Sequence, residues 1–477
     1  MKIIFLNPQG NFDRDDSYLT EHPDFGGQLV YVKEVALALA RLGVSVDVVT
    51  RRIDDPDWPG FEQTLDDFGL LADCVRIVRL DCGGPGFLAK EALWPHLPRF
   101  AEAIVDFYRE QMPHFATTHY ADGGYLGALL QAHAGIGFTF TGHSLGAQKL
   151  DKLGASVENF EEIDARFRFS QRIAAERLSM QRSASIVTST EDERRQQYAH
   201  PLYHGAIDPA DDNRFRVIPP GINTDIFNQD AASDPRQWLE KLRAAIRLPD
   251  RPHIVVSSRL DAKKNVAGVV TAYIGCSELQ QSAGLALFVR GVDDPWTELD
   301  RLKTDEQRVL GPILERIDAA GLRDRVSFIN ARSQRELAAA YRLFARQGSV
   351  FALPSLFEPF GLAPIEAAAC GLAVVATCNG GPVEIFADGA GLLMDPEDPE
   401  DMARALRRGL AEHQTLAEAG IKRVLSTYTW DRTAQSYLDL IEHNLATGSE
   451  AAPPALPELD ASALIYRHLA ALDSKAP

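Results

Sequence analysis

The chain has 477 residues, 45% of them hydrophobic, and its 67 acidic and 49 basic residues give a net charge of −18. This length predicts two or three domains, and the composition is typical of a soluble globular protein. The acidic balance argues against nucleic-acid and membrane partners, because affinity for their phosphates comes from basic surface. No apolar run is long enough to span a membrane, and the apolar N-terminus becomes polar at Asn7, too early for a signal peptide. The cytoplasm is therefore the expected location.

The five cysteines are scattered along the chain, and no pair has CxxC spacing. They lie at positions 74, 82, 276, 370 and 378. This pattern indicates neither a disulfide framework nor a zinc site. We therefore expect buried thiols and no bound metal.

Short β-branched runs recur along the chain and alternate with helical patterns. Continuous apolar runs predict strands buried on both faces, as in parallel sheets, and the alternation with helices predicts doubly wound α/β domains. The expected strands of the first half are Ile3–Leu6, Val44–Thr50, Val75–Leu80, Phe138–Thr141 and Ile186–Ser189. Those of the second half are Ile254–Ser258, Leu285–Val289, Val326–Ile329, Val350–Leu353 and Ala373–Ala376.

The alternation is interrupted once, at Ile218–Gly221 and the polar stretch Asn228–Arg236, and a new series begins near His253. We place a hinge there. Ligands of such sheets bind beyond the carboxyl ends of the strands, so we expect two domains facing each other across a cleft. The predicted segments are a Rossmann-like domain over 1–225, a second over 226–426, and a C-terminal helix and tail over 427–477, with this helix returning to the first domain.

A glycine turn, Asp24-Phe25-Gly26-Gly27-Gln28, precedes a predicted helix over Gln28–Leu42. That helix places Val32, Val35, Ala36 and Leu39 on one face. Glycines let a ligand approach the backbone closely, and the free N–H groups at a helix N-terminus favour an anion. A turn that merely caps the helix explains the pattern equally well.

The segment Gly142-His143-Ser144-Leu145-Gly146 follows a predicted strand and fits the G-x-S-x-G nucleophile elbow. A serine hydrolase with Ser144 as nucleophile is therefore a competing hypothesis. It requires an acid and then a histidine downstream, and the later histidines lie in no motif of their own. Gly84–Ala89 fits G-x-G-x-x-A, but the region where a dinucleotide site needs an acidic residue predicts a helix. No cofactor is expected.

A basic loop, Arg259 to Asn265, directly follows the predicted strand Ile254–Ser258. Arg259, Lys263 and Lys264 cluster there in an otherwise acidic chain. The position at the carboxyl end of a strand favours binding of a diphosphate over a merely solvated loop.

Two glutamates, Glu358 and Glu366, lie eight residues apart after the predicted strand Val350–Leu353. Pro364 suits the first turn of a helix, which places Glu366 near a helix start. Both carboxylates are expected to face the same crevice. The alternative is a helix-dipole acid together with a surface acid.

Together these motifs resemble those of the retaining GT-B glycosyltransferases that include the sucrose and sucrose-phosphate synthases. Glu358 and Glu366 match the E-x7-E pair of that superfamily, and Arg259 and Lys264 match its basic pair. Three segments resemble the bacterial sucrose-phosphate synthase branch in particular, namely Phe5–Gly10, Glu21–Leu29 and Thr141–Gly146. The resemblance covers roughly residues 1–445 and implies a GT-B fold.

The resemblance also implies individual roles. Arg259 and Lys264 would hold the donor diphosphate, and Glu366 would bind the ribose. Glu358 would hold the transferred glucose, helped by the backbone of Phe360, Gly361 and Leu362, and Gly27 would also contact the donor. His143 would contact the glucose at the reacting centre. The acceptor-binding residues would be Gly26, Gln28, Lys90, Tyr120, Ser144, Lys149 and Arg172.

The implied reaction moves a glucosyl unit from UDP-glucose, or from ADP-glucose, to fructose 6-phosphate, without a metal and with retention of configuration. Sucrose synthase, another retaining glycosyltransferase, the serine hydrolase and a non-catalytic sugar-nucleotide-binding protein remain alternatives. The last of these predicts loss of Glu358, Arg259 or Lys264, and all three are present. The sequence does not distinguish the two donors and does not give the oligomeric state.

Overall fold

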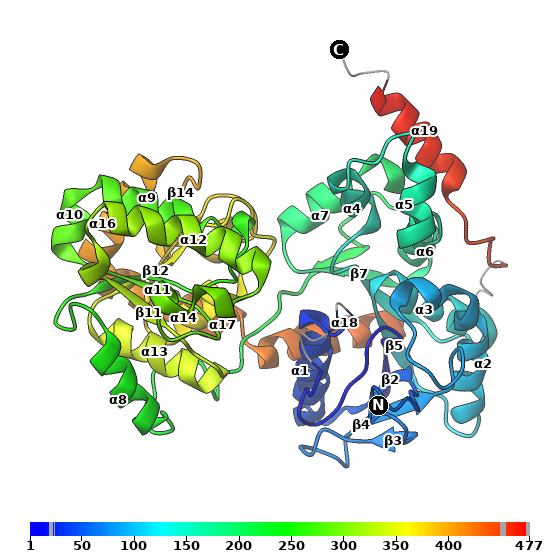
Figure 1. Ribbon diagram of the computed structural model, residues 1–477. Coiled ribbons are helices and arrows are strands. Elements are labelled where there is room, and N and C mark those ends of the chain that lie inside the picture. The colour runs from blue at the N-terminus through cyan, green and yellow to red at the C-terminus, as the bar shows by residue number, and fades with distance from the viewer. Residues whose placement is uncertain (19–21, 23, 449–454, 474–477) are drawn as a thin grey trace. The chain divides into compact units, whose positions relative to one another are not determined.

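The structure is a computed structural model that describes residues 1–18, 22, 24–448 and 455–473 (Figure 1). Glu21 and Pro23, which belong to one of the motifs quoted above, lie outside the described residues, as do residues 449–454 of the predicted tail. The chain forms two compact units. The first unit comprises Met1–Pro219 together with Thr433–Pro477, and the second comprises Pro220–Arg432.

The first unit is built on an eight-stranded sheet with the order β3-β4-β2-β1-β5-β6-β7-β8. All neighbouring strands are parallel except β3 and β4. The strands are β1 Lys2–Leu6, β2 Ser45–Arg51, β3 Leu65–Asp66, β4 Val75–Leu80, β5 Phe115–His119, β6 Phe138–Thr141, β7 Ser185–Thr188 and β8 Phe215–Val217. The α-helices are α1 Gly27–Arg41, α2 Leu97–Phe107, α3 Tyr120–Ala134, α4 Gly146–Lys152, α5 Phe160–Phe167, α6 Phe169–Arg182, α7 Glu191–Gln197, α18 Trp430–Thr447 and α19 Ser462–Asp473. The first residues of α18 belong to the second unit. The short 3-10 helices are η1 Lys90–Ala92, η2 Trp94–His96 and η3 Pro201–Tyr203.

The second unit is built on a six-stranded parallel sheet with the order β11-β10-β9-β12-β13-β14. Its strands are β9 His253–Val256, β10 Gly284–Phe288, β11 Val326–Ile329, β12 Val350–Leu353, β13 Ala373–Thr377 and β14 Leu392–Met394. Its α-helices are α8 Arg236–Ala245, α9 Val266–Gly275, α10 Ser277–Ser282, α11 Pro295–Glu298, α12 Thr304–Ala319, α13 Gln334–Arg346, α14 Leu362–Ala369, α15 Pro382–Ile385, α16 Pro399–Ala411 and α17 His413–Thr427, and its 3-10 helices are η4 Ala262–Lys264, η5 Leu299–Arg301, η6 Arg323–Arg325 and η7 Ala387–Gly389.

Helices cover both faces of this second sheet. Val255 of β9 packs in one core cluster with residues of α13 and α14. Its neighbours Ile254 and Val256 point to the other face, where they pack with residues of α9, α12 and α16. Successive strand side chains alternate between faces, so a strand covered on both sides needs an unbroken apolar run. The predicted α/β class with parallel sheets is confirmed.

All ten predicted strands are present, with ends that differ by no more than two residues. The predicted helix Gln28–Leu42 is α1, and its four predicted core residues are fully buried. Sequence analysis missed β3, β5, β8 and β14. β5 was missed because three of its five residues are polar, so Phe115-Ala116-Thr117-Thr118-His119 carries no apolar run. This omission matters most of the four.

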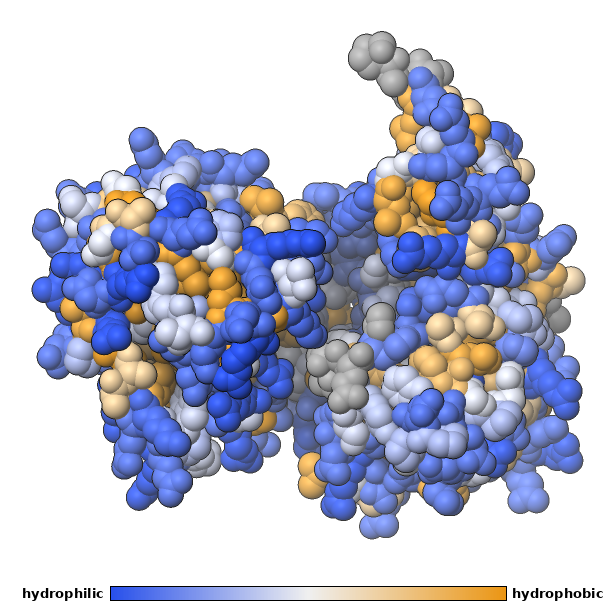
Figure 2. All heavy atoms as spheres, in the orientation of Figure 1, coloured by the Kyte–Doolittle hydropathy of each residue, from blue (hydrophilic) through white to orange (hydrophobic). Residues whose placement is uncertain are grey.

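Hydrophilic residues cover most of the face shown in Figure 2. Among the described residues, no helix combines the length and the apolar character needed to cross a bilayer.

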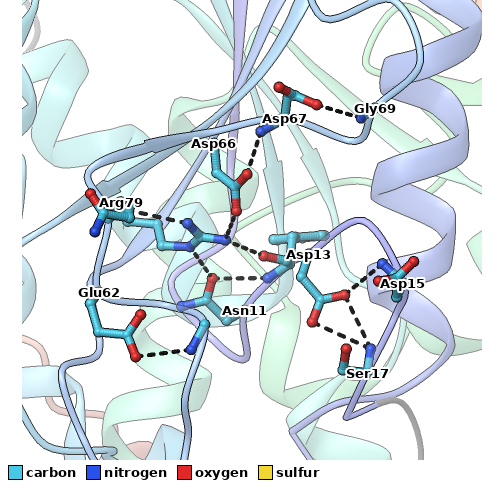
Figure 3. A network of polar contacts seen from close by, with 12 residues as sticks. Asn11, Asp13, Asp15, Ser17, Glu62, Asp66, Asp67, Gly69 and Arg79 are labelled. Carbon is cyan, nitrogen blue, oxygen red and sulfur yellow. Dashed lines mark hydrogen bonds and ion pairs between the residues drawn. The ribbon is translucent and has the colours of Figure 1, made fainter.

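Two buried arginines tie loops of the first unit to its sheet. On β4, Arg79 donates from Nε to Asn11 Oδ1 (3.0 Å) and from Nη2 to the Phe12 carbonyl (2.6 Å) and Asp66 Oδ2 (2.7 Å), as Figure 3 shows. On β2, Arg51 donates to carbonyl oxygens of the segment 82–88, which leads into η1. These bonds hold the loop after β1 and the loop after β4.

Replacement of Arg79 by methionine should lower the free energy of unfolding by about 2–4 kcal/mol. The change leaves the Phe12 carbonyl without its donor and removes the bond to the Asp66 carboxylate. An unpaired buried acceptor costs about 1–3 kcal/mol, and a hydrogen bond to a charged group contributes about 1.5–3 kcal/mol. Arg52→Met is the matched control, because the Arg52–Asp81 pair is exposed and such pairs contribute about 0.2–1 kcal/mol. Urea unfolding of the three proteins measures the difference. Equal losses for the two variants would contradict the role given to Arg79.

Candidate functional site

A pocket of about 300 Å³ lies in the first unit beyond the carboxyl ends of β1, β5 and β6. Ligands of parallel sheets bind at this edge. It brings together five of the seven residues predicted to bind the acceptor, whereas Gly26 and Gln28 do not line it. The lining residues are Gln9, Lys90, Glu91, Trp94, Tyr120, Ala121, Asp122, Ser144, Lys149, Phe167 and Arg172.

Lys90 is held at the pocket by the buried carboxylate of Asp24. Asp24 accepts from Lys90 Nζ (2.5 Å) through one oxygen and from the Lys90 backbone N–H (3.0 Å) through the other. Burial opposes the charge of the ammonium, but the bond to Asp24 outweighs it and raises the pKa of Lys90. Lys90 therefore stays charged.

Arg172 is fixed by a buried network around Glu176. Its Nε donates to Glu176 Oε1 (3.0 Å), and its Nη2 donates to the Ser144 carbonyl (2.5 Å). The same carboxylate accepts from the Gly146 N–H (2.9 Å) and from the Tyr203 hydroxyl. Burial raises the pKa of Glu176, although these donors oppose the effect. The network joins α4, α6 and η3 at one wall of the pocket.

Lys149 is the third cation of the pocket and has no carboxylate partner among the described residues. Its Nζ lies 4.9 Å from the centre of the Phe167 ring. Burial and then the neighbouring Arg172 and Lys90 lower its pKa. Mutual repulsion of three cations marks a place where an anion would be stabilised.

His143, predicted at the reacting centre, hydrogen bonds with His119 at the end of β5. His119 Nδ1 and His143 Nε2 are 2.9 Å apart. Burial lowers the pKa of His143 to about 4, and burial together with His143 lowers that of His119. Both rings are therefore neutral at neutral pH, and one must donate to the other, so their tautomers are coupled.

Ser144, the predicted alternative nucleophile, has no base. Its side chain is exposed, and no described histidine or acid hydrogen bonds with its hydroxyl. The neighbouring His143 is engaged with His119 instead. This arrangement lacks the oriented base that a serine nucleophile requires.

The glycine turn before α1 is open on the ligand side. A Cβ at Gly26 or Gly27 would meet no described atom within 4 Å. Gly26 has an extended backbone at the helix N-cap, and no side chain caps the helix. Gln28 is buried, and its Nε2 has no partner among the described residues. Packing against the described residues therefore does not require glycine at either position, and the backbone there is open to close approach.

In the second unit, the structure pairs two of the predicted donor residues. Lys264 Nζ donates to Glu358 Oε2 at 2.6 Å, and the Ser355 hydroxyl donates to the same oxygen at 3.2 Å. Lys264 ends η4, which Asp261 caps, and the Lys263 carbonyl accepts from the Leu356 N–H. The loops that carry the two side chains are therefore bonded to each other.

Glycines shape the loop around Glu358. Gly380 has φ +95°, and a Cβ there would lie 2.2 Å from the Glu358 carbonyl oxygen. Gly361 has φ +108°, which only glycine adopts easily, and it is the N-cap of α14. The backbone of Phe360, Gly361 and Leu362 thus turns from Glu358 directly into the helix that carries Glu366.

The side chains of Arg259 and Glu366 have no hydrogen-bond or ion-pair partner among the described residues. Arg259 is exposed at the start of the basic loop, whereas Glu366 is half-buried. Burial raises the pKa of Glu366 to about 7. Because the Glu366 carboxyl group has no partner among the described residues, its oxygens are available for hydrogen bonds with a ligand.

One group of possible metal ligands occurs among the described residues, formed by Asp151, His200 and His468. His200 Nδ1 accepts from the Leu202 N–H at 3.1 Å, so its proton lies on Nε2, which donates to Asp151 Oδ2 at 2.9 Å. A protonated nitrogen cannot bind a metal. These three residues are better explained as a contact between α19, which carries His468, and the rest of the first unit.

Sequence analysis missed His119, Asp122 and Glu176. The first two flank Tyr120 at the end of β5, and without that strand nothing placed them at the ligand-binding edge. Glu176 lies within α6, where a glutamate is indistinguishable from a solvated helical acid.

Comparison with known proteins identifies two domains. Residues 26–221 match the glycosyl transferase 4-like domain, and residues 240–423 match the glycosyl transferases group 1. The probable sucrose-phosphate synthase of Thermosipho melanesiensis is 42% identical over 93% of this chain and 96% of its own. The sucrose-phosphate synthase of Zea mays is 32% identical over 91% of this chain and 46% of its own, so the chain spans about half the length of this plant relative.

Solved structures of glycosyltransferases also match the fold of this chain. The sucrose-phosphate synthase from Thermosynechococcus elongatus has a TM-score of 0.64 at 25% identity and covers 94% of this chain and 100% of its own. Anabaena HepE in complex with UDP-glucose has a TM-score of 0.57 at 16% identity and covers 93% of this chain and 100% of its own, which shows the shared fold. The predicted GT-B fold is confirmed.

The raised pKa of the half-buried Glu366 should make stability depend on pH. The folded state retains the carboxyl proton up to about pH 7, whereas the unfolded state loses it near the ordinary glutamate pKa of 4.5. As pH rises from 5 to 7, the wild type should therefore lose stability relative to Glu366→Gln, by at most about 1.4 kcal/mol per pH unit. Urea unfolding at several pH values tests this, with exposed Glu315→Gln as control. Parallel stability curves for wild type and Glu366→Gln would mean that Glu366 ionises freely.

Proposed function

Because the chain belongs to the sucrose-phosphate synthase family of group 1 glycosyltransferases, we propose that it transfers glucose from UDP-glucose or ADP-glucose to fructose 6-phosphate. The products are sucrose 6-phosphate and a nucleoside diphosphate. The observation that carries this assignment is the convergence of Lys90, Lys149 and Arg172 on one pocket of a chain whose net charge is −18.

The acceptor phosphate accounts for this concentration of positive charge. Three cations in a partly buried pocket repel one another, and a dianionic phosphate removes that repulsion. Tyr120 and Ser144 add hydroxyl groups to the wall. Free fructose, the acceptor of a sucrose synthase, offers nothing for the cations to bind. The pocket therefore favours a sugar phosphate, with Gly26 and Gln28 approaching the same acceptor from the start of α1.

The second unit supplies the groups for the donor. Arg259 and Lys264 bind the diphosphate, Glu366 binds the ribose, and Glu358 with the backbone at 360–362 binds the glucose. In the structure, Lys264 and Glu358 neutralise each other. A bound nucleotide sugar offers each a better partner, a phosphate for the ammonium and hydroxyl groups for the carboxylate. Gly27 and His143 complete the donor contacts, with His143 at the reacting carbon.

The reaction breaks the bond between the glucose anomeric carbon and the diphosphate oxygen, and the electron pair leaves with the diphosphate. Arg259 and Lys264 stabilise this growing negative charge, which is the role of a preorganised cation. The acceptor hydroxyl attacks from the face that the diphosphate leaves, so configuration is retained, and its proton passes to the departing phosphate. The protein cations perform the charge stabilisation that a divalent metal provides elsewhere.

A direct assay tests the proposal. Purified protein is offered UDP-glucose and ADP-glucose, each with fructose 6-phosphate or free fructose. Sucrose 6-phosphate from the phosphorylated acceptor is expected. Transfer to free fructose alone would instead favour a sucrose synthase.

Lys149→Ala should lower kcat/KM for fructose 6-phosphate by about 10–150-fold, since a hydrogen bond to a charged group contributes roughly 1.5–3 kcal/mol. Use of free fructose should change little, because that acceptor has no phosphate to lose. Lys152→Ala, an exposed lysine at the end of the same helix, is the control. Steady-state kinetics with both acceptors separate the cases, and an equal loss for both acceptors would show that Lys149 does not recognise the phosphate.

Lys264→Ala should reduce kcat by about 10²–10³, the usual effect of losing one group that stabilises transition-state charge. Lys264 is only partly buried and fills no core space, so folding should persist. Lys263→Ala changes the exposed neighbour and should leave kcat near that of the wild type. A folded Lys264→Ala enzyme with undiminished kcat would refute the role of Lys264.

A further inference from the structure

Three buried acids surround the pocket of the first unit, and they differ in how fully their oxygens are bonded. Both oxygens of Asp24 accept hydrogen bonds from Lys90. Both oxygens of Glu176 accept bonds, from Gly146, Arg172 and Tyr203. Asp122 is different, because its Oδ2 is buried and has no partner among the described residues.

The unpaired oxygen belongs to a side chain that lines the pocket. Asp122 is only 4% exposed and lies in the first turn of α3. Gly123 allows that turn to approach β1, since a Cβ there would lie 2.7 Å from the Leu6 carbonyl oxygen. Burial raises the pKa of Asp122 to about 7. A buried oxygen without a donor costs free energy that a ligand can recover.

We propose that Asp122 Oδ2 accepts a hydrogen bond from a ring hydroxyl of the acceptor sugar, and so selects a sugar phosphate over a bare phosphate. This inference rests on the proposed function of the pocket. A carboxylate repels a phosphate, so the phosphate binds toward Lys149 and Arg172 and the hydroxylated part of the ligand faces Asp122. The pocket volume of about 300 Å³ lies within the range of small-molecule sites, with room beyond a lone anion.

A purely local role for Asp122 explains less. An acid in the first turn of a helix is stabilised by the free N–H groups there, and the N–H groups of Asp122 and Gly123 lower its pKa slightly. That role engages one side of the carboxyl group. It does not account for an Oδ2 that has no partner among the described residues, on a side chain that lines a pocket.

Calorimetric binding of two probes, fructose 6-phosphate and inorganic phosphate, tests the proposal at pH 8, where Asp122 is ionised. Asp122→Asn should weaken fructose 6-phosphate binding by about 10–150-fold. Inorganic phosphate should bind unchanged or more tightly, because a negative charge has left the pocket. Glu91→Gln removes a negative charge from another lining residue, which pairs with Lys90 at 3.5 Å. Because both probes carry a phosphate, this variant should preserve the ratio of the two affinities.

The outcomes are distinguishable. If Asp122→Asn keeps the wild-type preference for the sugar phosphate, the role of Asp122 is wrong while the acceptor assignment stands. If the wild type binds both probes equally, the acceptor assignment and the role of Asp122 both fail. Retained phosphate binding shows that the variant pocket is intact.

Should Asp122→Asn not fold, deoxy analogues of fructose 6-phosphate, each lacking one ring hydroxyl, can be titrated into the wild type. One analogue should lose about as much affinity as the variant is expected to lose. Equal affinity for all analogues would overturn the proposal.

Discussion

The first unit depends on one buried carboxylate, that of Glu176. It neutralises Arg172 at the pocket wall, accepts the first free N–H of α4 from Gly146, and bonds to the Tyr203 hydroxyl. Three elements distant in sequence meet at this side chain. A buried charge is stable only when its hydrogen-bonding capacity is filled, so the carboxylate fixes its partners in position. The placement of Arg172 is a consequence of that requirement.

Two other cations are also paired with a carboxylate. Asp24 holds Lys90, and Glu358 holds Lys264. Each pairing holds a partly exposed cation in place within a strongly acidic chain. Lys149 is the exception, since it faces the Phe167 ring and two other cations, and its pKa is lowered by burial and by those cations. It therefore gains most from an incoming anion, whereas Arg172 is largely satisfied without one.

Much of the fold and of the candidate site was predictable because, apart from β3, the strands of both sheets are parallel. Buried parallel strands produce apolar runs, and the loops after those runs carry the chemistry, so His143, Ser144, Arg259 and Lys264 could be assigned to one edge of each sheet from spacing alone. The roles of Lys90, Tyr120, Lys149 and Arg172 were not predictable in that way. They came from resemblance, because their convergence on one pocket is produced by tertiary packing that no local pattern records.

The residues that were missed share a physical cause. β5 has threonine at 117 and 118, where its neighbour β1 has Phe5 and Leu6. The carboxyl end of β5 lies beside the pocket, and its side chains hydrogen bond there, as His119 does with His143. A strand end whose side chains hydrogen bond beside a pocket thus loses the apolar signal by which strands are recognised. Asp122 is hidden for a related reason, because an acid at a helix start has an ordinary explanation in the helix dipole. Only the structure shows that one of its oxygens is buried and unbonded. Functional polar residues are therefore hardest to find where local sequence rules already explain their presence.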